Sequence, residues 1–270
     1  MLIPFRIGLR FVALCCAVLA TLAGCATLGD ETGSAQVAFI TTPRAVVTRM
    51  LQLANVTGDD VVYDLGSGDG RIVIAAAKRG AHALGIEFNP DMVELSQATA
   101  KKEGVADRAT FQKGDIFEAD LNKASVITMY LLPSLNMKLR PKLLELKPGT
   151  RIVTHAFTME DWEPDQSISV EERMGYLWIV PAKVEGSWTS QAGSANATLA
   201  LKQTFQKLDG TLNANGKNLS IANGKMEGEK ITFTAGDTAY TGRVSAGVIE
   251  GTAKTGTAAP VKWSAKRAAR

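Results

Sequence analysis

The residues with the clearest potential for chemistry form a glycine-rich turn beside a carboxylate. The apolar, β-branched run from Val61 ends in Asp64, and glycines follow at positions 66, 68 and 70 before a helix-favouring stretch. The expected order is therefore strand, tight turn and helix. Gly66 and Gly68 allow the backbone to approach a ligand closely, and the helix offers unpaired N–H groups at its start. This combination is typical of a turn that binds a nucleotide cofactor.

The spacing of the glycines disfavours one cofactor and matches another. A dinucleotide fingerprint needs a third glycine three residues after Gly68, but Arg71 stands there, so an NAD site is not expected. The segment Asp64-Leu-Gly-Ser-Gly-Asp-Gly70 instead resembles motif I of the class I S-adenosylmethionine methyltransferases. The resemblance implies a Rossmann-like α/β sheet with helices on both faces and S-adenosylmethionine as the cofactor.

The same resemblance assigns roles to residues in three successive strand–helix units. It implies that Glu87, at the end of the second strand, accepts hydrogen bonds from both ribose hydroxyls, and that Asp115, after the third strand, lies near the adenine. The expected cofactor-binding residues are Thr42, Asp64, Gly66, Gly68, Glu87, Asp115 and Ile116. An α/β fold with no ligand in this turn is the alternative, but ordinary strand-to-helix loops rarely combine these glycines with both carboxylates.

A helix is expected just before the glycine-rich turn. Thr42 suits its N-cap and Pro43 its first turn, and apolar residues recur at helical spacing from Val46 to Ala54. The family places such a helix over the cofactor cleft. Phe39, Thr41 and Thr42 are therefore candidates for the cofactor wall, and hydrophobic anchoring of the helix is an equally good interpretation.

The segments at the end of the expected fourth strand and in the helix after it indicate which group of methyltransferases the chain resembles. Met129-Tyr-Leu-Leu-Pro133 and Leu139-Arg-Pro-Lys-Leu143 resemble the lysine methyltransferases of the mitochondrial ATP synthase c-subunit and adenine nucleotide translocase type, together with their bacterial relatives. The similarity extends from about Phe39 to Asp165. It implies that Tyr130 and Pro133 lie at the transferred methyl group and that the acceptor is an amine, most simply a protein lysine. Core packing is the alternative role for Tyr130.

Two other functions stay open at this point. The chain could be an envelope lipoprotein that binds a ligand without catalysis, or a methyltransferase that acts on a small molecule or a lipid.

His155, expected at the end of the fifth strand, could act as a general base, but we favour a role in holding the neighbouring loop by hydrogen bonds. The loop from Met159 to Trp162 could wall the substrate entrance. Direct methyl displacement requires no metal, and we expect none.

Residues 1–25 resemble a bacterial lipoprotein signal peptide. Arg6 and Arg10 precede the apolar stretch from Phe11 to Leu22, and Leu22-Ala-Gly-Cys25 has the form of a lipobox. We therefore expect a lipid on Cys25, a membrane anchor and a place in the bacterial cell envelope; a plain signal peptide or an uncleaved anchor is the alternative. All three cysteines lie in this segment, so the folded part should contain no disulfide. Export conflicts with the cytosolic supply of S-adenosylmethionine.

The composition suggests two folded domains behind this segment. Residues 26–36 suit a tether, residues 37–185 the methyltransferase domain, and residues 186–270 a separate antiparallel all-β domain. Short alternating runs between glycine- and asparagine-rich turns predict an up-and-down barrel or sheet of six to eight strands with a packed interior, rather than one that encloses a ligand. This last part has 11 basic and 5 acidic residues. The charges are scattered, which favours a solvated surface over binding to an anionic membrane, and we expect no nucleic-acid partner.

Overall fold

The computed structural model describes residues 40–268 of the chain. The expected signal peptide, the lipidation site Cys25, the tether and Phe39 lie outside these residues. Within them, a seven-stranded sheet is followed by a closed barrel. No helix in residues 40–268 is both long enough and apolar enough to cross a membrane.

The seven-stranded sheet has the order β3-β2-β1-β4-β5-β7-β6. Its parallel strands are β1 (Val61–Leu65), β2 (His82–Glu87), β3 (Ala109–Lys113), β4 (Val126–Met129) and β5 (Arg151–His155). The antiparallel strands are β6 (Gln166–Val170) and β7 (Arg173–Ile179). The strand order changes direction at β1, which pairs with both β2 and β4. In an open α/β sheet, ligands bind outside the carboxyl ends of the strands at such a switch point.

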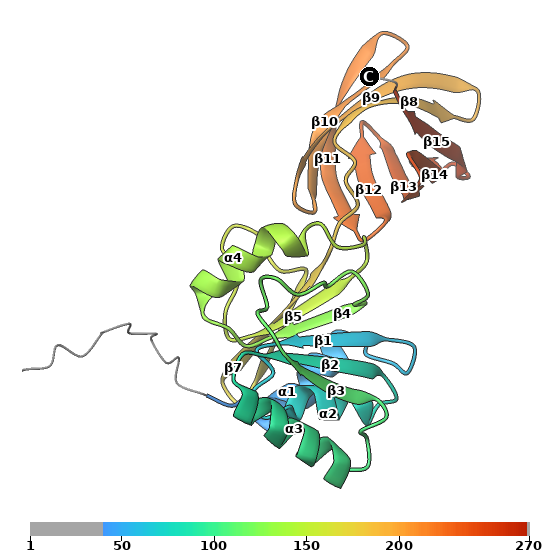
Figure 1. Ribbon diagram of the computed structural model, residues 1–270. Helices are drawn as coiled ribbons and strands as arrows, with labels where there is room; N and C mark the ends of the chain where they lie inside the picture. The colour runs from blue at the N-terminus through green and yellow to red at the C-terminus, as the bar shows by residue number, and fades with distance from the viewer. Residues whose placement is uncertain (1–39, 269–270) are drawn as a thin grey trace, which may run out of the picture. The chain divides into compact units, whose positions relative to one another are not determined.

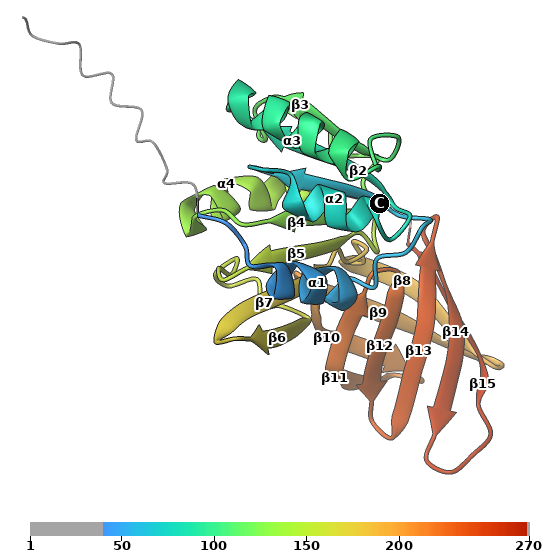
Figure 2. The ribbon, with the colours of Figure 1, turned by 90° about the horizontal axis from the view of Figure 1, so that it is seen from below.

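Helices cover both faces of this sheet (Figure 1, Figure 2). The helices α1 (Arg44–Leu53), α2 (Arg71–Ala77) and α3 (Pro90–Lys102) lie on one face, and α4 (Pro133–Leu143) lies on the other. Met50 and Val73 belong to the core of the first face, and Leu139 and Leu143 to that of the second. Burial on both faces explains why the central strands β1 and β4 are almost continuously apolar. The predicted Rossmann-like class is confirmed.

The helix starts agree with the sequence in one case and differ in another. Asn89 caps α3 as predicted, since its side-chain oxygen accepts a hydrogen bond from the Asp91 N–H at 2.9 Å. The prediction that Thr42 caps α1 is wrong, because Pro43 takes the N-cap position and no side chain caps the helix. The Thr42 hydroxyl lies instead 3.1 Å from Nδ1 of His155. This contact joins α1 to the end of β5.

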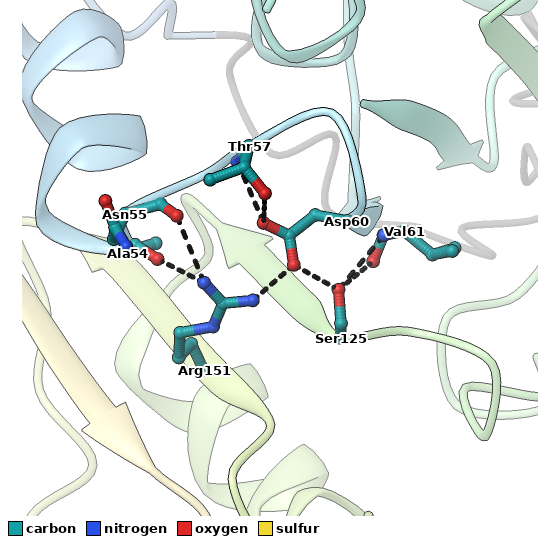
Figure 3. Close-up of polar contacts among 7 residues, drawn as sticks. All are labelled: Ala54, Asn55, Thr57, Asp60, Val61, Ser125 and Arg151. Carbon is teal, nitrogen blue, oxygen red and sulfur yellow. Dashed lines mark hydrogen bonds and ion pairs between the residues drawn. The ribbon is translucent and has the colours of Figure 1, made fainter. Parts of the chain in front are cut away.

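An ion-pair network fixes the opposite end of α1 to the amino-terminal edge of the sheet (Figure 3). Arg151 of β5 donates to the Ala54 carbonyl at 2.7 Å and pairs with the Asp60 carboxylate. Asp60 also accepts hydrogen bonds from the Ser125 hydroxyl at 2.7 Å and the Thr57 N–H at 2.9 Å. Burial alone would raise the pKa of Asp60, but these bonds and the Arg151 charge outweigh it and lower the pKa. The network lies at the edge away from the candidate site and is expected to be structural.

The second part of the chain is a closed antiparallel barrel of eight strands in the order β10-β11-β12-β13-β14-β15-β8-β9. The strands are β8 (Gly186–Ala192), β9 (Ala195–Thr204), β10 (Lys207–Ala214), β11 (Lys217–Glu227), β12 (Lys230–Ala235), β13 (Thr238–Ser245), β14 (Val248–Thr255) and β15 (Val261–Arg267). Its core is apolar and well packed. Phe233, Tyr240 and Trp263 form an aromatic cluster with ring centroids 4.7 to 5.6 Å apart, and Trp188 is fully buried. These contacts agree with the packed interior that the sequence predicts.

Candidate active site

The predicted site residues gather at one edge of the parallel sheet. Asp64 lies near the end of β1, Glu87 ends β2, Asp115 follows β3, Tyr130 follows β4 and His155 ends β5. The carboxyl ends of parallel strands share an edge, so these five side chains come from neighbouring positions along it. The structure therefore brings the sequence-predicted residues together, and their individual roles toward a cofactor stay predictions.

The glycine-rich turn between β1 and α2 is closely constrained. Its Gly66 N–H donates to the Ile86 carbonyl at 2.9 Å, which ties the turn to β2. Gly66 has a φ of 74°, and a Cβ atom there would lie 2.9 Å from a methyl group of Leu131. Gly70 has a φ of 77°, and its Cβ would lie 2.7 Å from the Phe111 ring. Both positions therefore require glycine for conformation and for space.

Glu87 presents its carboxylate directly beside this turn. One of its oxygens accepts a hydrogen bond from the Gly68 N–H at 2.9 Å, and the other accepts one from the Asn89 N–H at 3.0 Å. A carboxylate has about four acceptor positions, so two remain for further donors. The side chain is only half-buried. A fixed, accessible carboxylate with free acceptor positions fits a cofactor that carries a pair of ribose hydroxyls.

The adenine-side candidates are less constrained than Glu87. Asp115 is exposed, and its Oδ1 accepts a hydrogen bond from the Phe117 N–H at 2.8 Å, which leaves the second carboxylate oxygen free. Ile116 is half-buried and packs against the core of the α4 face. An exposed acceptor next to an apolar side chain suits the edge and the face of a purine ring.

Asp64 is the most perturbed carboxyl group of the site. Its side chain is 2% exposed, and its Oδ1 accepts a hydrogen bond from the Thr128 hydroxyl at 2.6 Å. Burial raises the pKa of Asp64 to about 7; the Thr128 bond opposes the shift, and the charges of Glu87 and Asp69 add to it. Strongly perturbed titratable groups cluster at functional sites. A buried carboxylate poised near neutrality would be stabilised as an anion by a positively charged ligand.

On the acceptor side, Tyr130 lies against two further rings. Its ring centroid is 4.1 Å from that of His155 and 6.2 Å from that of Phe157, which is nearly parallel to it. Tyr130 is half-buried, whereas Pro133, the first residue of α4, is exposed. The rings provide an aromatic wall beside the end of β4, where the acceptor is expected.

His155 is fully buried and suits a holding role better than a base role. Its Nδ1 contacts the Thr42 hydroxyl, and its Nε2 has no hydrogen-bond partner among the described residues. Burial lowers the pKa of His155 to about 4, and the charge of Arg173 contributes. A general base works best when its pKa lies near the operating pH. A histidine that stays neutral across the physiological range would be a weak base for an ammonium group.

Of residues Met159 to Trp162, which could wall the substrate entrance, only the middle two, Glu160 and Asp161, are exposed. Met159 and Trp162 are both fully buried and belong to the core of the α4 face. The Trp162 carbonyl accepts a hydrogen bond from the indole N–H of Trp178 at 2.7 Å. These large apolar side chains turn inward because the burial of an aromatic residue is among the largest favourable contributions to folding. We call the rings of Tyr130 and Phe157 the acceptor wall, and an entrance role for the loop stays a prediction.

Sequence reasoning missed three residues of the site. Thr128 is directly paired with Asp64 in the register of β1 and β4, and a threonine inside an otherwise apolar strand was the available signal. Phe157 and Arg71 gave no such signal, because their positions depend on how loops and helix starts meet in space. Arg71 had served only as evidence against an NAD site.

The chain is similar to known methyltransferases over this part of its length. Residues 64–166 match the family model of the ANTKMT methyltransferase domain. A protein-lysine N-methyltransferase of Saccharolobus islandicus (strain REY15A) is 48% identical over 151 residues, which cover 53% of this chain and 94% of the relative. The chain belongs to the same methyltransferase family.

Other relatives of this methyltransferase agree on the chemistry but differ in the acceptor that their names give. The ATP synthase c-subunit lysine N-methyltransferase of Xenopus laevis is 33% identical over 148 residues, which cover 54% of this chain and 60% of the relative. A crystal structure of an RNA methyltransferase from Salinibacter ruber, in complex with S-adenosyl-L-homocysteine, is 52% identical with a TM-score of 0.53. It covers 54% of this chain and 96% of that one. S-adenosylhomocysteine is what remains of S-adenosylmethionine after it has donated its methyl group. The chain described here is therefore an S-adenosylmethionine-dependent methyltransferase.

Proposed function

We propose that this methyltransferase modifies the side-chain amine of a protein lysine. The observation that carries the proposal is the 48% identity to a protein-lysine N-methyltransferase over 94% of that relative's length. The similarity to an ATP synthase c-subunit lysine N-methyltransferase supports the same acceptor class. The alternative of a non-catalytic binding lipoprotein has no support in these comparisons, and methylation of a lipid or small molecule becomes an outcome of the test.

We assign cofactor binding to the carboxyl edge of β1, β2 and β3. Bound S-adenosylmethionine supplies a methyl group that its sulfonium charge already activates. Gly66 and Gly68 keep the turn narrow enough for close approach, and Glu87 offers acceptors for the ribose hydroxyls. Asp115 and Ile116 suit the adenine, and the carboxylate of Asp64 would be favoured as an anion near the sulfonium end. Thr42 contributes by fixing the segment before α1 through its contact with His155.

Acceptor chemistry is assigned to the aromatic wall after β4. The face of Tyr130 attracts a cation, so it would favour the charge that grows on a lysine amine as the new bond to carbon forms. The neutral His155 adds no positive charge beside that amine, and its low pKa makes it unsuitable for removing the ammonium proton. Backbone carbonyls from Tyr130 to Leu132 would accept the amine hydrogens, and the proton would leave to solvent. Pro133 would set the direction of the chain at this point by starting α4.

We also propose that the enzyme is tethered to the membrane of the bacterial cell envelope. The support is the sequence of residues 1–25, with basic residues, an apolar stretch and the lipobox ending in Cys25. A Cys25→Ser variant should lose labelling by a palmitate analogue. Retention of lipid label by that variant would contradict the assignment.

The acceptor class is tested by following methyl groups from labelled S-adenosylmethionine. The chain beginning at Ala26 is incubated with extracted cell proteins, RNA and lipids in separate reactions, and the protein fraction is hydrolysed to amino acids. We expect label in N-methylated lysine and none above the no-enzyme blank in the other two fractions. RNA is included because the similar Salinibacter structure is named an RNA methyltransferase. Label found only in RNA, or only in lipid, would refute the lysine assignment.

A further inference from the structure

Arg71 connects two parts of the site that are far apart in the sequence. It is the first residue of α2, and its guanidinium forms a fork with the Asp69 carboxylate, with Nε at 2.9 Å from Oδ1 and Nη2 at 2.5 Å from Oδ2. Its remaining terminal nitrogen, Nη1, donates to the Thr42 carbonyl at 2.8 Å. One side chain therefore joins the glycine-rich turn to the segment that leads into α1.

Thr42 is held from two sides by these contacts. Its carbonyl accepts from Arg71, and its hydroxyl pairs with His155, whose ring lies against Tyr130. Thr42 is 4% exposed and His155 is fully buried, so water competes little for either bond. A continuous series of contacts thus runs from Asp69 in the cofactor turn to Tyr130 at the acceptor wall.

The geometry of Arg71 differs from that of an ordinary helix anchor. Arg79, two residues beyond the end of α2, donates to the carbonyl of Thr48 in α1 at 3.0 Å, but it forms no ion pair with a carboxylate of residues 40–268. Core packing by Val46 and Met50 already fixes α1 on the sheet. The additional fork to Asp69 has its effect on the glycine-rich turn, because an Arg–carboxylate pair with two parallel bonds fixes both position and orientation.

We propose that Arg71 is a positioning residue that couples the cofactor turn to the acceptor wall through Thr42 and His155. The planar guanidinium is required because it satisfies the carboxylate and the carbonyl at the same time, which a lysine ammonium does not do in this geometry. The positive charge of Arg71 also lies directly beside Asp69, one of three carboxylates around this turn together with Asp64 and Glu87. The proposal rests on the proposed function only for the lysine acceptor, since its effect on S-adenosylmethionine binding does not depend on the acceptor.

The test compares Arg71→Met with the matched variant Arg79→Met, because each loses one arginine bond to a backbone carbonyl in α1 or just before it. S-adenosylmethionine binding is measured by calorimetry on the chain beginning at Ala26, and melting temperature is measured in parallel. We expect Arg71→Met to weaken binding about tenfold or more and Arg79→Met to weaken it less than about twofold, at similar losses of melting temperature. Equal effects of the two variants, or binding by Arg71→Met within about twofold of the original chain, would overturn the proposal.

Arg71→Lys keeps the test decisive if Arg71→Met does not fold. It retains the charge beside Asp69 and loses the simultaneous bond to Thr42, so we expect binding weakened about three- to tenfold and a raised KM for the acceptor. Wild-type binding and kinetics in Arg71→Lys would show that charge alone suffices, which would refute the coupling. The original chain could fail to methylate lysine while the Arg71 variants still weaken S-adenosylmethionine binding as expected. That result would refute the proposed acceptor and leave the role of Arg71 in place.

Discussion

Replacement of Asp64 by asparagine should stabilise the protein without cofactor while it impairs cofactor binding. The carboxyl group is 2% exposed, and the Thr128 hydroxyl donates to its Oδ1 at 2.6 Å. An asparagine has nearly the same shape and keeps an oxygen that can accept this bond. The substitution therefore removes a buried charge and little else.

The size of the effect follows from the pKa of Asp64, which rises from 3.8 to about 7 because of burial and the charges of Glu87 and Asp69. The folded chain binds this proton more tightly than the unfolded chain, so stability is lost as the pH rises from about 4 to about 7. A shift of about 3 pKa units corresponds to about 4 kcal/mol. Asparagine does not titrate, so Asp64→Asn should gain up to about 4 kcal/mol above pH 7, and about half of this gain should appear between pH 5 and pH 7.

Urea unfolding followed by circular dichroism at about 222 nm measures this difference at several pH values between about 5 and 8. The helical signal comes from α1 to α4, which all precede the barrel among the described residues, so it reports on the domain that contains Asp64. Asp115→Asn is the matched control, because it makes the same chemical change at an exposed carboxyl group of the same edge. A stability difference for Asp64→Asn that stays constant with pH, or that favours the original chain at pH 8, would refute the reasoning.

Three further predictions address the site and its support. Glu87→Gln should raise the KM for S-adenosylmethionine about 10- to 100-fold in steady-state assays, because a charged acceptor becomes neutral; a change below about twofold would contradict the assigned role. Arg151→Met should cost about 2–3 kcal/mol in urea unfolding with an unchanged KM, since it leaves Asp60 unpaired. That stabilisation should be present at neutral pH and lost as the pH falls below about 4, because the pKa of Asp60 is lowered in the folded state; a loss equal at all pH values would argue against the ion pair. His155→Asn should raise the acceptor KM while the pH profile of kcat keeps its shape between about pH 6 and 8, and loss of a limb near pH 6 to 7 would restore His155 as the base.

The parallel sheet was predictable from the sequence because polar or charged residues mark where its apolar strands end. Glu87 and His155 end β2 and β5 at the residues where the sequence placed them. The turn between β6 and β7 has no such marker, because it is made by Glu171 and Glu172, both at positive φ. Glutamate gives no sign of such a turn, whereas glycine or asparagine would have done so.

In the barrel, strands that lack strong alternation were the hardest to predict. Alternation is clear in β12, Lys230–Ala235, whose apolar side chains at every second position are buried. The strand β14 contains Gly251, whose Cβ would lie 1.9 Å from the Thr241 carbonyl oxygen, so its glycine serves close strand approach and weakens the sequence pattern. Barrel closure depends on pairing between β8 and β15, which are distant in sequence, and no local pattern encodes that pairing.

The sequence identified the carboxylates of the site but not their partners. Motif spacing was enough to single out Asp64 and Glu87, because each lies at or beside the end of a strand on the same edge. The pairing of Thr42 with His155 joins residues 113 positions apart, and tertiary packing alone determines it. For that reason the expected N-cap at Thr42 was wrong, and its role toward the cofactor stays a prediction.

The central claim is that this edge of the sheet forms an S-adenosylmethionine pocket organised by Glu87 and Asp64. Isothermal titration calorimetry of the chain beginning at Ala26 with S-adenosylmethionine tests it most directly, with Glu87→Gln titrated in parallel. The account predicts one molecule bound per chain, with affinity about tenfold or more weaker in Glu87→Gln. No heat of binding at about millimolar cofactor, or equal affinity in the two chains, would contradict it.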